Sequence, residues 1–336
     1  MAAVSYGAMD LLTGPGLAPL SPVDVPPPDL SAEPAGFVVA TDSGSRIHVL
    51  AWDAESVGGP PPPEAPSVLL LHGLASTAWS WAPAARRLRS AARVVAMDLR
   101  GHGLSDAPTD GYEPDTLADD AIAVAEGSGL LGLPDDPPAG PLVVAGVGYG
   151  AVVAAWTAHA LGDRCGGLVL VDGGWEDLAA STGATAEEWL AAIEEPPEVL
   201  ASMSAWLADR EAFDPATWDA DEERAARAQV VETAAGRVKI AVHPHALAGS
   251  VRAMWAYEPA AVLPSVEARI AALMARDEDG SRATALGDVA RAREATGRPP
   301  VMAAAYPSRG HNLVRHESAA VAGAVLAVAA AATMRA

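Results

Sequence analysis

The segment Pro141-Leu-Val-Val-Ala-Gly-Val-Gly-Tyr-Gly-Ala-Val-Val-Ala-Ala155 decides the fold class of this chain. An apolar run over residues 142–145 leads into a glycine-rich turn at 146–150, and an alanine- and valine-rich stretch follows. A short apolar run that ends in glycines and precedes a longer apolar stretch is typical of a buried strand joined to a helix. The segment therefore predicts a strand–turn–helix unit.

The same alternation continues on both sides of this unit. Strands are predicted at 36–40, 46–52, 67–71, 93–97, 142–145, 168–171, 269–275 and 300–306, and helices at 78–91, 116–131, 151–161, 281–295 and 319–333. Continuous apolar strands that alternate with helices indicate a parallel sheet covered on both faces. We therefore expect an α/β fold with a mostly parallel, eight-stranded sheet. Its first two strands, joined without a helix, should form an antiparallel edge.

Four parts of the chain are distinguished by composition. We expect a Pro/Gly-rich N-terminal arm over 1–35, a first part of the α/β core over 36–172, a helical cap over 173–255 and a second part of the core over 256–336. The cap region shows no convincing strand and carries five tryptophans. Because it follows a strand, it should cover the carboxyl edge of the sheet, where open α/β folds bind ligands.

The charge and cysteine content exclude several function classes. The chain of 336 residues has a net charge of −21, which disfavours nucleic acid and anionic membrane surfaces as partners. Its single cysteine fits a reducing compartment, and its first residues lack the pattern of a secretory signal. The apolar run 319–333 is shorter than the ~20 residues of a membrane span. We expect a cytoplasmic protein that binds a small molecule, and a homo-oligomer is left open.

Four motifs occur in a fixed order along the chain. They are Leu-His-Gly-Leu at 71–74, Asp-Leu-Arg-Gly-His-Gly-Leu-Ser-Asp at 98–106, Gly-Val-Gly-Tyr-Gly at 146–150 and Arg-Gly-His-Asn-Leu at 309–313. In this order and spacing the chain resembles the α/β-hydrolase family over roughly residues 36–332. Each motif alone is only moderately specific, but the set is strongly so.

The resemblance implies roles for particular residues. His311 matches the catalytic histidine, between the last strand and the last helix. The main-chain N–H groups of Leu74 and Tyr149 match the oxyanion hole. The catalytic acid of the family follows the strand that here is 269–275, which favours Asp277 as the partner of His311 and places Asp279 second. No cofactor and no metal are implied, and no zinc-binding spacing or phosphate loop is found.

The chain departs from the family at Gly148. The resemblance places a nucleophilic Ser, Cys or Asp there, and glycine has no side chain to attack a substrate. One hypothesis is a hydrolase in which His311 and its acid activate water, acting on a small apolar ester or carbonyl compound. The other is a pseudo-hydrolase that only binds a ligand. Pocket candidates are His72, Ser76 and Trp175.

A different class of function remains open for the same segment. Gly146 to Ala151 also fits the G-x-G-x-x-A pattern of dinucleotide-binding proteins, and Asp172 ends the next strand, where an acid that binds the ribose would lie. Such a unit usually opens its domain, whereas four predicted strands precede this one. Asp172 is also an alternative to Asp277 as the acid beside His311.

Overall fold

The computed structural model describes residues 10–52, 64–132, 140–193 and 198–333. Its main feature is a ten-stranded sheet in the order β1-β12-β11-β8-β7-β5-β6-β4-β3, with β2 paired to β12. The strands are β1 (Asp10–Leu11), β2 (Leu17–Pro19), β3 (Ala35–Ala40), β4 (Arg46–Ala51), β5 (Ser67–Leu71), β6 (Arg93–Met97), β7 (Leu142–Val147), β8 (Cys165–Val171), β11 (Arg269–Met274) and β12 (Val301–Ala305). All eight predicted strands are present.

The pairing directions match the prediction of a mostly parallel sheet. The pairs β5·β6, β5·β7, β7·β8, β8·β11 and β11·β12 are parallel. β3 and β4 form the predicted antiparallel edge, and β4 also pairs antiparallel with β6. The prediction of an α/β fold is therefore confirmed, and the parallel strands place their carboxyl ends along one edge of the sheet.

Helices cover both faces of the sheet because alternate strand residues point in opposite directions. Leu69, Leu71 and Val144 join a core cluster with α2 (Pro114–Gly127) and α3 (Tyr149–Leu161). Val68 and Val143 join a second cluster with α1 (Ala82–Leu88) and α12 (Ser318–Thr333). α12 corresponds to the helix predicted at 319–333, and half of its residues are buried. None of the helices in the described part of the chain combines the length and the apolar character of a membrane-spanning helix.

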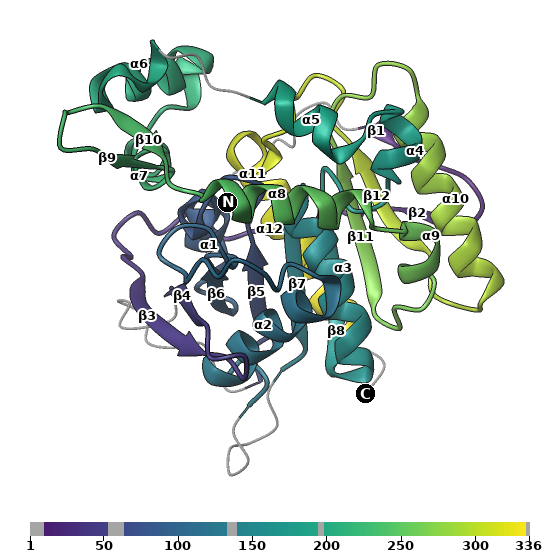
Figure 1. The fold of residues 1–336 in the computed structure, drawn as a ribbon. Coiled ribbons are helices and arrows are strands. Elements are labelled where there is room, and N and C mark those ends of the chain that lie inside the picture. Colours follow the sequence, from purple (N-terminus) through teal and green to yellow (C-terminus); the bar gives the residue numbers. More distant parts are fainter. Residues whose placement is uncertain (1–9, 53–63, 133–139, 194–197, 334–336) are drawn as a thin grey trace.

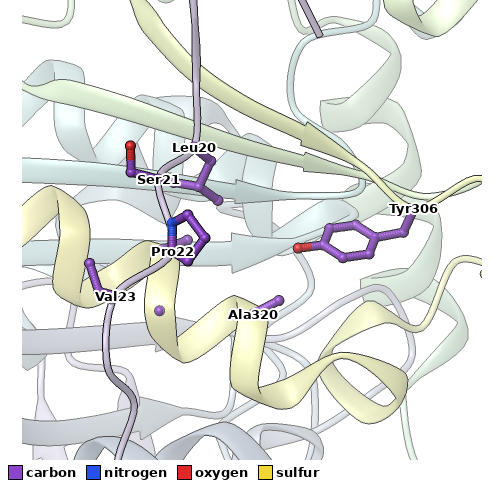
Figure 2. A pocket seen from close by; sticks show the side chains of 8 residues that line it. Leu20, Ser21, Pro22, Val23, Tyr306 and Ala320 are labelled. Carbon is purple, nitrogen blue, oxygen red and sulfur yellow. The ribbon is translucent and has the colours of Figure 1, made fainter. Parts of the chain in front are cut away.

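The N-terminal arm belongs to the sheet at its far edge. β1 runs antiparallel and β2 parallel to β12. After β2 the chain crosses the outer surface of α12, and Figure 2 shows Leu20 and Pro22 lying over that helix near Tyr306. The cavity between them holds only about 10 Å³, so it is a packing gap and too small for a ligand. Residues 1–9 of the predicted arm lie outside the described residues.

The segment between β8 and β11 is inserted above the carboxyl edge of the sheet (Figure 1). It contains α4 (Leu178–Thr182), α5 (Ala186–Ala192), α6 (Met203–Phe213), α7 (Ala220–Ala228), α8 (Pro244–Trp255) and α9 (Pro259–Val262). The expectation of no strand here is wrong, because β9 (Val230–Glu232) and β10 (Val238–Ile240) form a separate antiparallel hairpin. We call this segment, 173–268, the insertion. The predicted domain boundaries stay a prediction.

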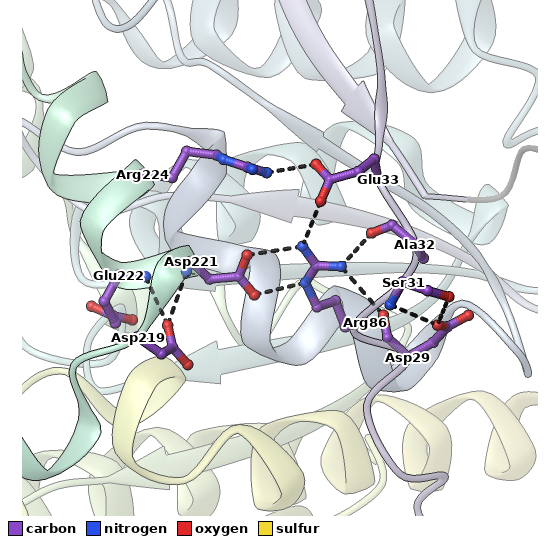
Figure 3. Close-up of polar contacts among 9 residues, drawn as sticks. All are labelled: Asp29, Ser31, Ala32, Glu33, Arg86, Asp219, Asp221, Glu222 and Arg224. Carbon is purple, nitrogen blue, oxygen red and sulfur yellow. Dashed lines mark hydrogen bonds and ion pairs between the residues drawn. The ribbon is translucent and has the colours of Figure 1, made fainter.

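A buried arginine ties the insertion to the core. Arg86 of α1 donates to both carboxylate oxygens of Asp221 in α7, at 2.6 and 2.9 Å (Figure 3). Its other donors reach the main-chain oxygens of Asp29 and Ala32 in the arm, and Glu33 at 3.3 Å. Two-point pairing of a guanidinium with a carboxylate fixes geometry as well as charge. Three parts of the chain are thus joined at one side chain.

Candidate active site

The turn between β7 and α3 has the geometry of a sharp elbow. Gly148 has φ 54° and ψ −115°, in a region that residues with a side chain rarely adopt. Glycine is also required on either side, since a Cβ at Gly146 would overlap the main chain of Gly150, and one at Gly150 would overlap that of Leu71. A Cβ at Gly148 meets no backbone atom within 4 Å. The middle position of the turn is therefore the open one.

His311 faces this open position. A Cβ built on Gly148 would lie 3.1 Å from Nε2 and 3.3 Å from Cε1 of His311. The imidazole is carried by the loop between β12 and α11 (Leu313–His316), as predicted from its place in the sequence. Its side chain is 68% exposed, so it is open to the space above the turn. The ring thus presents Nε2 to any molecule bound over Gly148.

The partner of His311 is Asp172. Nδ1 of His311 lies 2.6 Å from Oδ2 of Asp172, which is 2% exposed at the end of β8. The other carboxylate oxygen accepts from the main-chain N–H of Ala275 and from Arg282, both at 2.7 Å. Burial by itself would raise the pKa of Asp172, but the hydrogen bond from His311, the charge of Arg282 and the bond from Ala275 together lower it. Asp172 is thus held as a carboxylate, which makes Nδ1 of His311 a donor and leaves Nε2 with its lone pair.

The structure corrects the predicted partners Asp277 and Asp279. Asp277 accepts from the main-chain N–H groups of Gly280 at 3.1 Å and Ala283 at 2.8 Å, and Asp279 accepts from that of Ser281 at 2.9 Å. Both carboxylates therefore cap the start of α10 (Ser281–Ala295). The turn after β11 directs them to the helix and leaves the place beside His311 to Asp172.

Two further charged residues beside His311 and Asp172 were not predicted from the sequence. Arg282, on the first turn of α10, donates to Asp172 and also to Oε1 of Glu176 at 2.5 Å. Burial raises the pKa of Glu176, although the charge of Arg282 opposes that shift. The indole of Trp175 donates to the main-chain oxygen of Arg282 at 3.2 Å. No motif indicates this group, because its members come from two segments more than a hundred residues apart.

The same contacts remove Asp172 from the role of a ribose-binding acid. Both of its carboxylate oxygens are occupied, by His311 on one side and by Arg282 and Ala275 on the other. A carboxylate in a dinucleotide site must keep its oxygens for the ribose hydroxyls. The alternative interpretation of the turn as a dinucleotide-binding loop has no geometric support.

The predicted main-chain donors lie beside the turn. Tyr149 is the first residue of α3, where a main-chain N–H has no acceptor within the helix, and Leu74 follows β5 in the neighbouring loop. The loop is fixed by His72, whose Nδ1 donates to the oxygen of Gly73 at 2.7 Å while Nε2 accepts from the N–H of Leu99 at 2.9 Å. Burial lowers the pKa of His72, so the imidazole is neutral. His72 is fully buried and therefore supports the loop from beneath.

A large cleft of about 1520 Å³ lies over this group. Its floor includes Gly148, Asp172 and His311 at the carboxyl edge of the sheet, and its roof comes from the insertion. Among the predicted pocket residues, Ser76 lines the cleft. His72 and Trp175 are buried beneath it and do not. The tryptophans that line the cleft are Trp189, Trp218 and Trp255.

A second charged contact joins the insertion to the histidine loop. Arg315 of α11 donates to Thr217 at 2.6 Å and to the main-chain oxygen of Asp214 at 2.8 Å, and lies 3.4 Å from Glu222. Burial raises the pKa of Glu222 to about 7, because Arg315 only partly offsets that burial and the charges of neighbouring aspartates. Glu222 and Arg315 both line the cleft.

No group of three or more metal-binding side chains occurs among the described residues.

Comparison with known proteins adds a family and several relatives. The model of the alpha/beta hydrolase family matches residues 68–324, which is more than half of the chain. Epoxide hydrolase 4 of Mus musculus is 37% identical over 95 residues, or 28% of this chain and 24% of that protein. Epoxide hydrolase B of Mycobacterium tuberculosis strain H37Rv is 35% identical over 130 residues, or 38% of this chain and 32% of that protein. The chain thus matches a third or less of the length of these relatives.

Solved structures resemble the fold over most of the chain. The crystal structure of E-2-(acetamidomethylene)succinate hydrolase superposes with a TM-score of 0.68 at 20% identity, covering 88% of this chain and 98% of that one. A thioesterase domain from the curacin biosynthetic pathway gives a TM-score of 0.62, also at 20% identity, over 87% and 99%. At this identity the likeness concerns the fold.

Proposed function

Because the chain belongs to the alpha/beta hydrolase family, we propose that it is a cofactor-free hydrolase in which His311 and Asp172 activate water against an apolar ester or related carbonyl compound. The observation that carries the proposal is the orientation of His311. Its Nδ1 is held by Asp172 at 2.6 Å, and its Nε2 faces the empty position above Gly148. A base oriented in this way requires no side chain at residue 148.

Hydrolysis of an ester would involve two proton transfers, one from water to His311 and one from His311 to the leaving group. Nε2 of His311 takes a proton from a water molecule while the water oxygen attacks the carbonyl carbon, and Asp172 stabilises the imidazolium that forms. The negative charge that develops on the carbonyl oxygen is accepted by the N–H groups of Leu74 and Tyr149. The imidazolium then returns the proton to the leaving alkoxide, which gives an acid and an alcohol. No covalent bond to the protein is formed.

The expected contributions are large enough for slow but measurable turnover. A positioned general base typically contributes 10²–10⁴-fold, and one donor in an oxyanion hole about 3 kcal/mol. Both are smaller than the gain from a full nucleophilic mechanism, so we expect slow turnover. Epoxides are also candidate substrates, because relatives named epoxide hydrolases share a part of this sequence and ring opening likewise consumes one water.

A panel of esters, lactones and epoxides tests this proposal. Wild type is compared with His311→Ala, and thermal melting shows that both are folded. Hydrolysis by wild type that falls by about 10²-fold or more in His311→Ala supports the proposal. Turnover that is unchanged in His311→Ala would overturn it, and a fluorophosphonate probe would then show whether Ser76 or another serine had reacted.

A non-catalytic, ligand-binding protein is the second candidate. One observation favours it: the central residue of the turn is Gly148, which has no side chain, although a large cleft lies above it. This candidate predicts no hydrolysis of any compound in the panel, together with an increased melting temperature when an apolar carbonyl compound binds. The same compounds and protein variants therefore distinguish the hydrolase from the ligand-binding protein.

A further inference from the structure

The cleft is larger than a small ester requires. Ligand pockets typically enclose about 300–1,000 Å³, whereas this one measures about 1520 Å³. The reacting group of the substrate needs only the part of it around Gly148 and His311. The remaining space extends under the insertion and is bordered by α4, α5, α8 and, farther out, by α6, α7 and β10.

One side of this outer space is apolar. We call it the apolar wall. Its members come from α4, α5, the residue directly after α5, and α8: Leu178, Trp189, Leu190, Ile193, Met254 and Trp255. The rings of Trp189 and Trp255 lie 5.4 Å apart at 49°, so they form one continuous surface. The Trp255 indole N–H is satisfied by the main-chain oxygen of Ala184 at 2.7 Å. The rest of the indole ring is apolar, so it has no unsatisfied hydrogen-bonding group.

The apolar wall is exposed to solvent, although contact of apolar side chains with water is unfavourable. Ile193 is 36% exposed, and the other five members are only half-buried. Charged residues of the outer cleft, among them Asp209, Arg210, Glu222 and Lys239, come from α6, α7 and β10 instead. A contiguous apolar surface inside a cleft is typical of a binding site for an apolar group.

We propose that the substrate carries an extended hydrocarbon chain that lies along the apolar wall while its carbonyl group is held over Gly148. This inference rests on the proposed function, because it places the reacting group at His311. The hydrocarbon chain of the substrate would bind because water is released from its surface and from the tryptophan rings. Burial of each methylene should then increase affinity about three- to fourfold until the wall is filled.

The test measures binding without turnover. Straight-chain methyl ketones of about four to twelve carbons present a carbonyl group and have no bond to hydrolyse, and their affinities for the full chain are measured by calorimetry. For wild type, affinity should rise about three- to fourfold with each methylene. Equal affinities along the series would overturn the proposal.

Two matched substitutions test where the hydrocarbon chain of the ketone binds. Ile193→Asp places a carboxylate on the apolar wall, and Leu104→Asp makes the same change at a side chain that is 76% exposed and does not line the cleft. Ile193→Asp should lower the affinity of the longest ketones about tenfold or more and leave the shortest ketones unaffected. Leu104→Asp should bind the whole series as wild type does. An equal loss in both variants, or none in Ile193→Asp, would contradict the proposal. Trp189→Leu, which keeps the position apolar but replaces the indole ring by a smaller aliphatic side chain, should give an intermediate loss.

Failure of this inference can be told from failure of the proposed function. Binding that rises with chain length in a protein that hydrolyses nothing would support the apolar wall and refute the hydrolase. Hydrolysis of short esters with no dependence on chain length would support the hydrolase and refute the apolar wall.

Discussion

Nδ1 of His311 and Oδ2 of Asp172 lie 2.6 Å apart, although 139 residues separate the two in the sequence. The strand order explains this contact, because only β11 lies between β8, which is followed directly by Asp172, and β12, which precedes His311. The pair is therefore assembled by the sheet, and its geometry depends on the main chain at two strand ends.

Substitution of Asp172 should affect turnover much more than substitution of Asp277. Asp172→Asn removes the charge that orients His311, and we expect kcat to fall by about 10²–10⁴-fold. Asp277→Asn changes only the cap of α10, so it should cost about 1 kcal/mol of stability and keep kcat close to wild type. Steady-state rates on a compound that wild type hydrolyses, with melting curves for each variant, check this. Equal loss in both variants would contradict the assignment of Asp172.

Gly148→Ser should create a reactive serine. The new Cβ would lie 3.1 Å from Nε2 of His311, so the imidazole must move by a few tenths of an ångström, and the positive φ should cost about 1–2 kcal/mol. The hydroxyl would then adjoin a base that is already oriented. We expect a fluorophosphonate probe to label Gly148→Ser and to leave wild type and Gly148→Ala unlabelled. Labelling of Gly148→Ala would show that another residue reacts.

Arg282→Gln should shift acid unfolding to higher pH. The folded pKa of Asp172 is below its ordinary value of 3.8, so its contribution to stability is present above that value and is lost as pH falls through the folded pKa. Without Arg282, burial of Asp172 is less well compensated and the pKa of Asp172 rises. We expect a loss of about 2–3 kcal/mol near neutral pH, because the pair is largely buried. Circular dichroism against pH measures both effects.

A matched control for this prediction is Arg276→Gln. Arg276 is 57% exposed and lies 3.7 Å from Glu278, which is 83% exposed, so water and salt screen the pair. Its acid unfolding should match that of wild type. Coincident curves for Arg282→Gln and wild type would mean that Arg282 does not stabilise Asp172.

Glu222 should make stability fall as pH rises toward neutrality. Its folded pKa is about 7 against an ordinary value of 4.5, so the folded state binds more protons than the unfolded state between these values. Stability is therefore lost as pH increases from about 4.5 to 7, by up to about 3 kcal/mol. Glu222→Gln cannot lose this proton, so its melting temperature should decline less than that of wild type over the same range. Parallel pH profiles for the two proteins would refute the assignment.

The eight predicted strands were accessible from sequence because each is a short run rich in apolar residues, and all of them except the mostly exposed β3 are largely buried in the structure. β1 and β2 were not, since two- and three-residue strands leave no periodic pattern. The β9–β10 hairpin was missed for the same reason, although Gly236, with φ 74°, marks its turn. Short strands depend on the surface that receives them, and a single sequence does not show that surface.

The sequence motifs anticipated that His311 lies near Gly148, but they did not indicate which carboxylate lies beside His311. The loop that carries His311 and the turn at Gly148 were placed by their motifs, and the structure brings them together. The partner of His311 depended on where the chain turns after β11, and that turn directs Asp277 to the main chain of α10. Arg282 gave no signal, because a salt bridge between distant segments has no pattern in sequence.

The central claim is that water is activated at His311 without a covalent intermediate. Intact-protein mass spectrometry on samples quenched during turnover of an ester tests it most directly. The account predicts product formation with the protein mass unchanged, and loss of product formation in His311→Ala. An acyl adduct on wild type that forms and decays at the rate of turnover would contradict it.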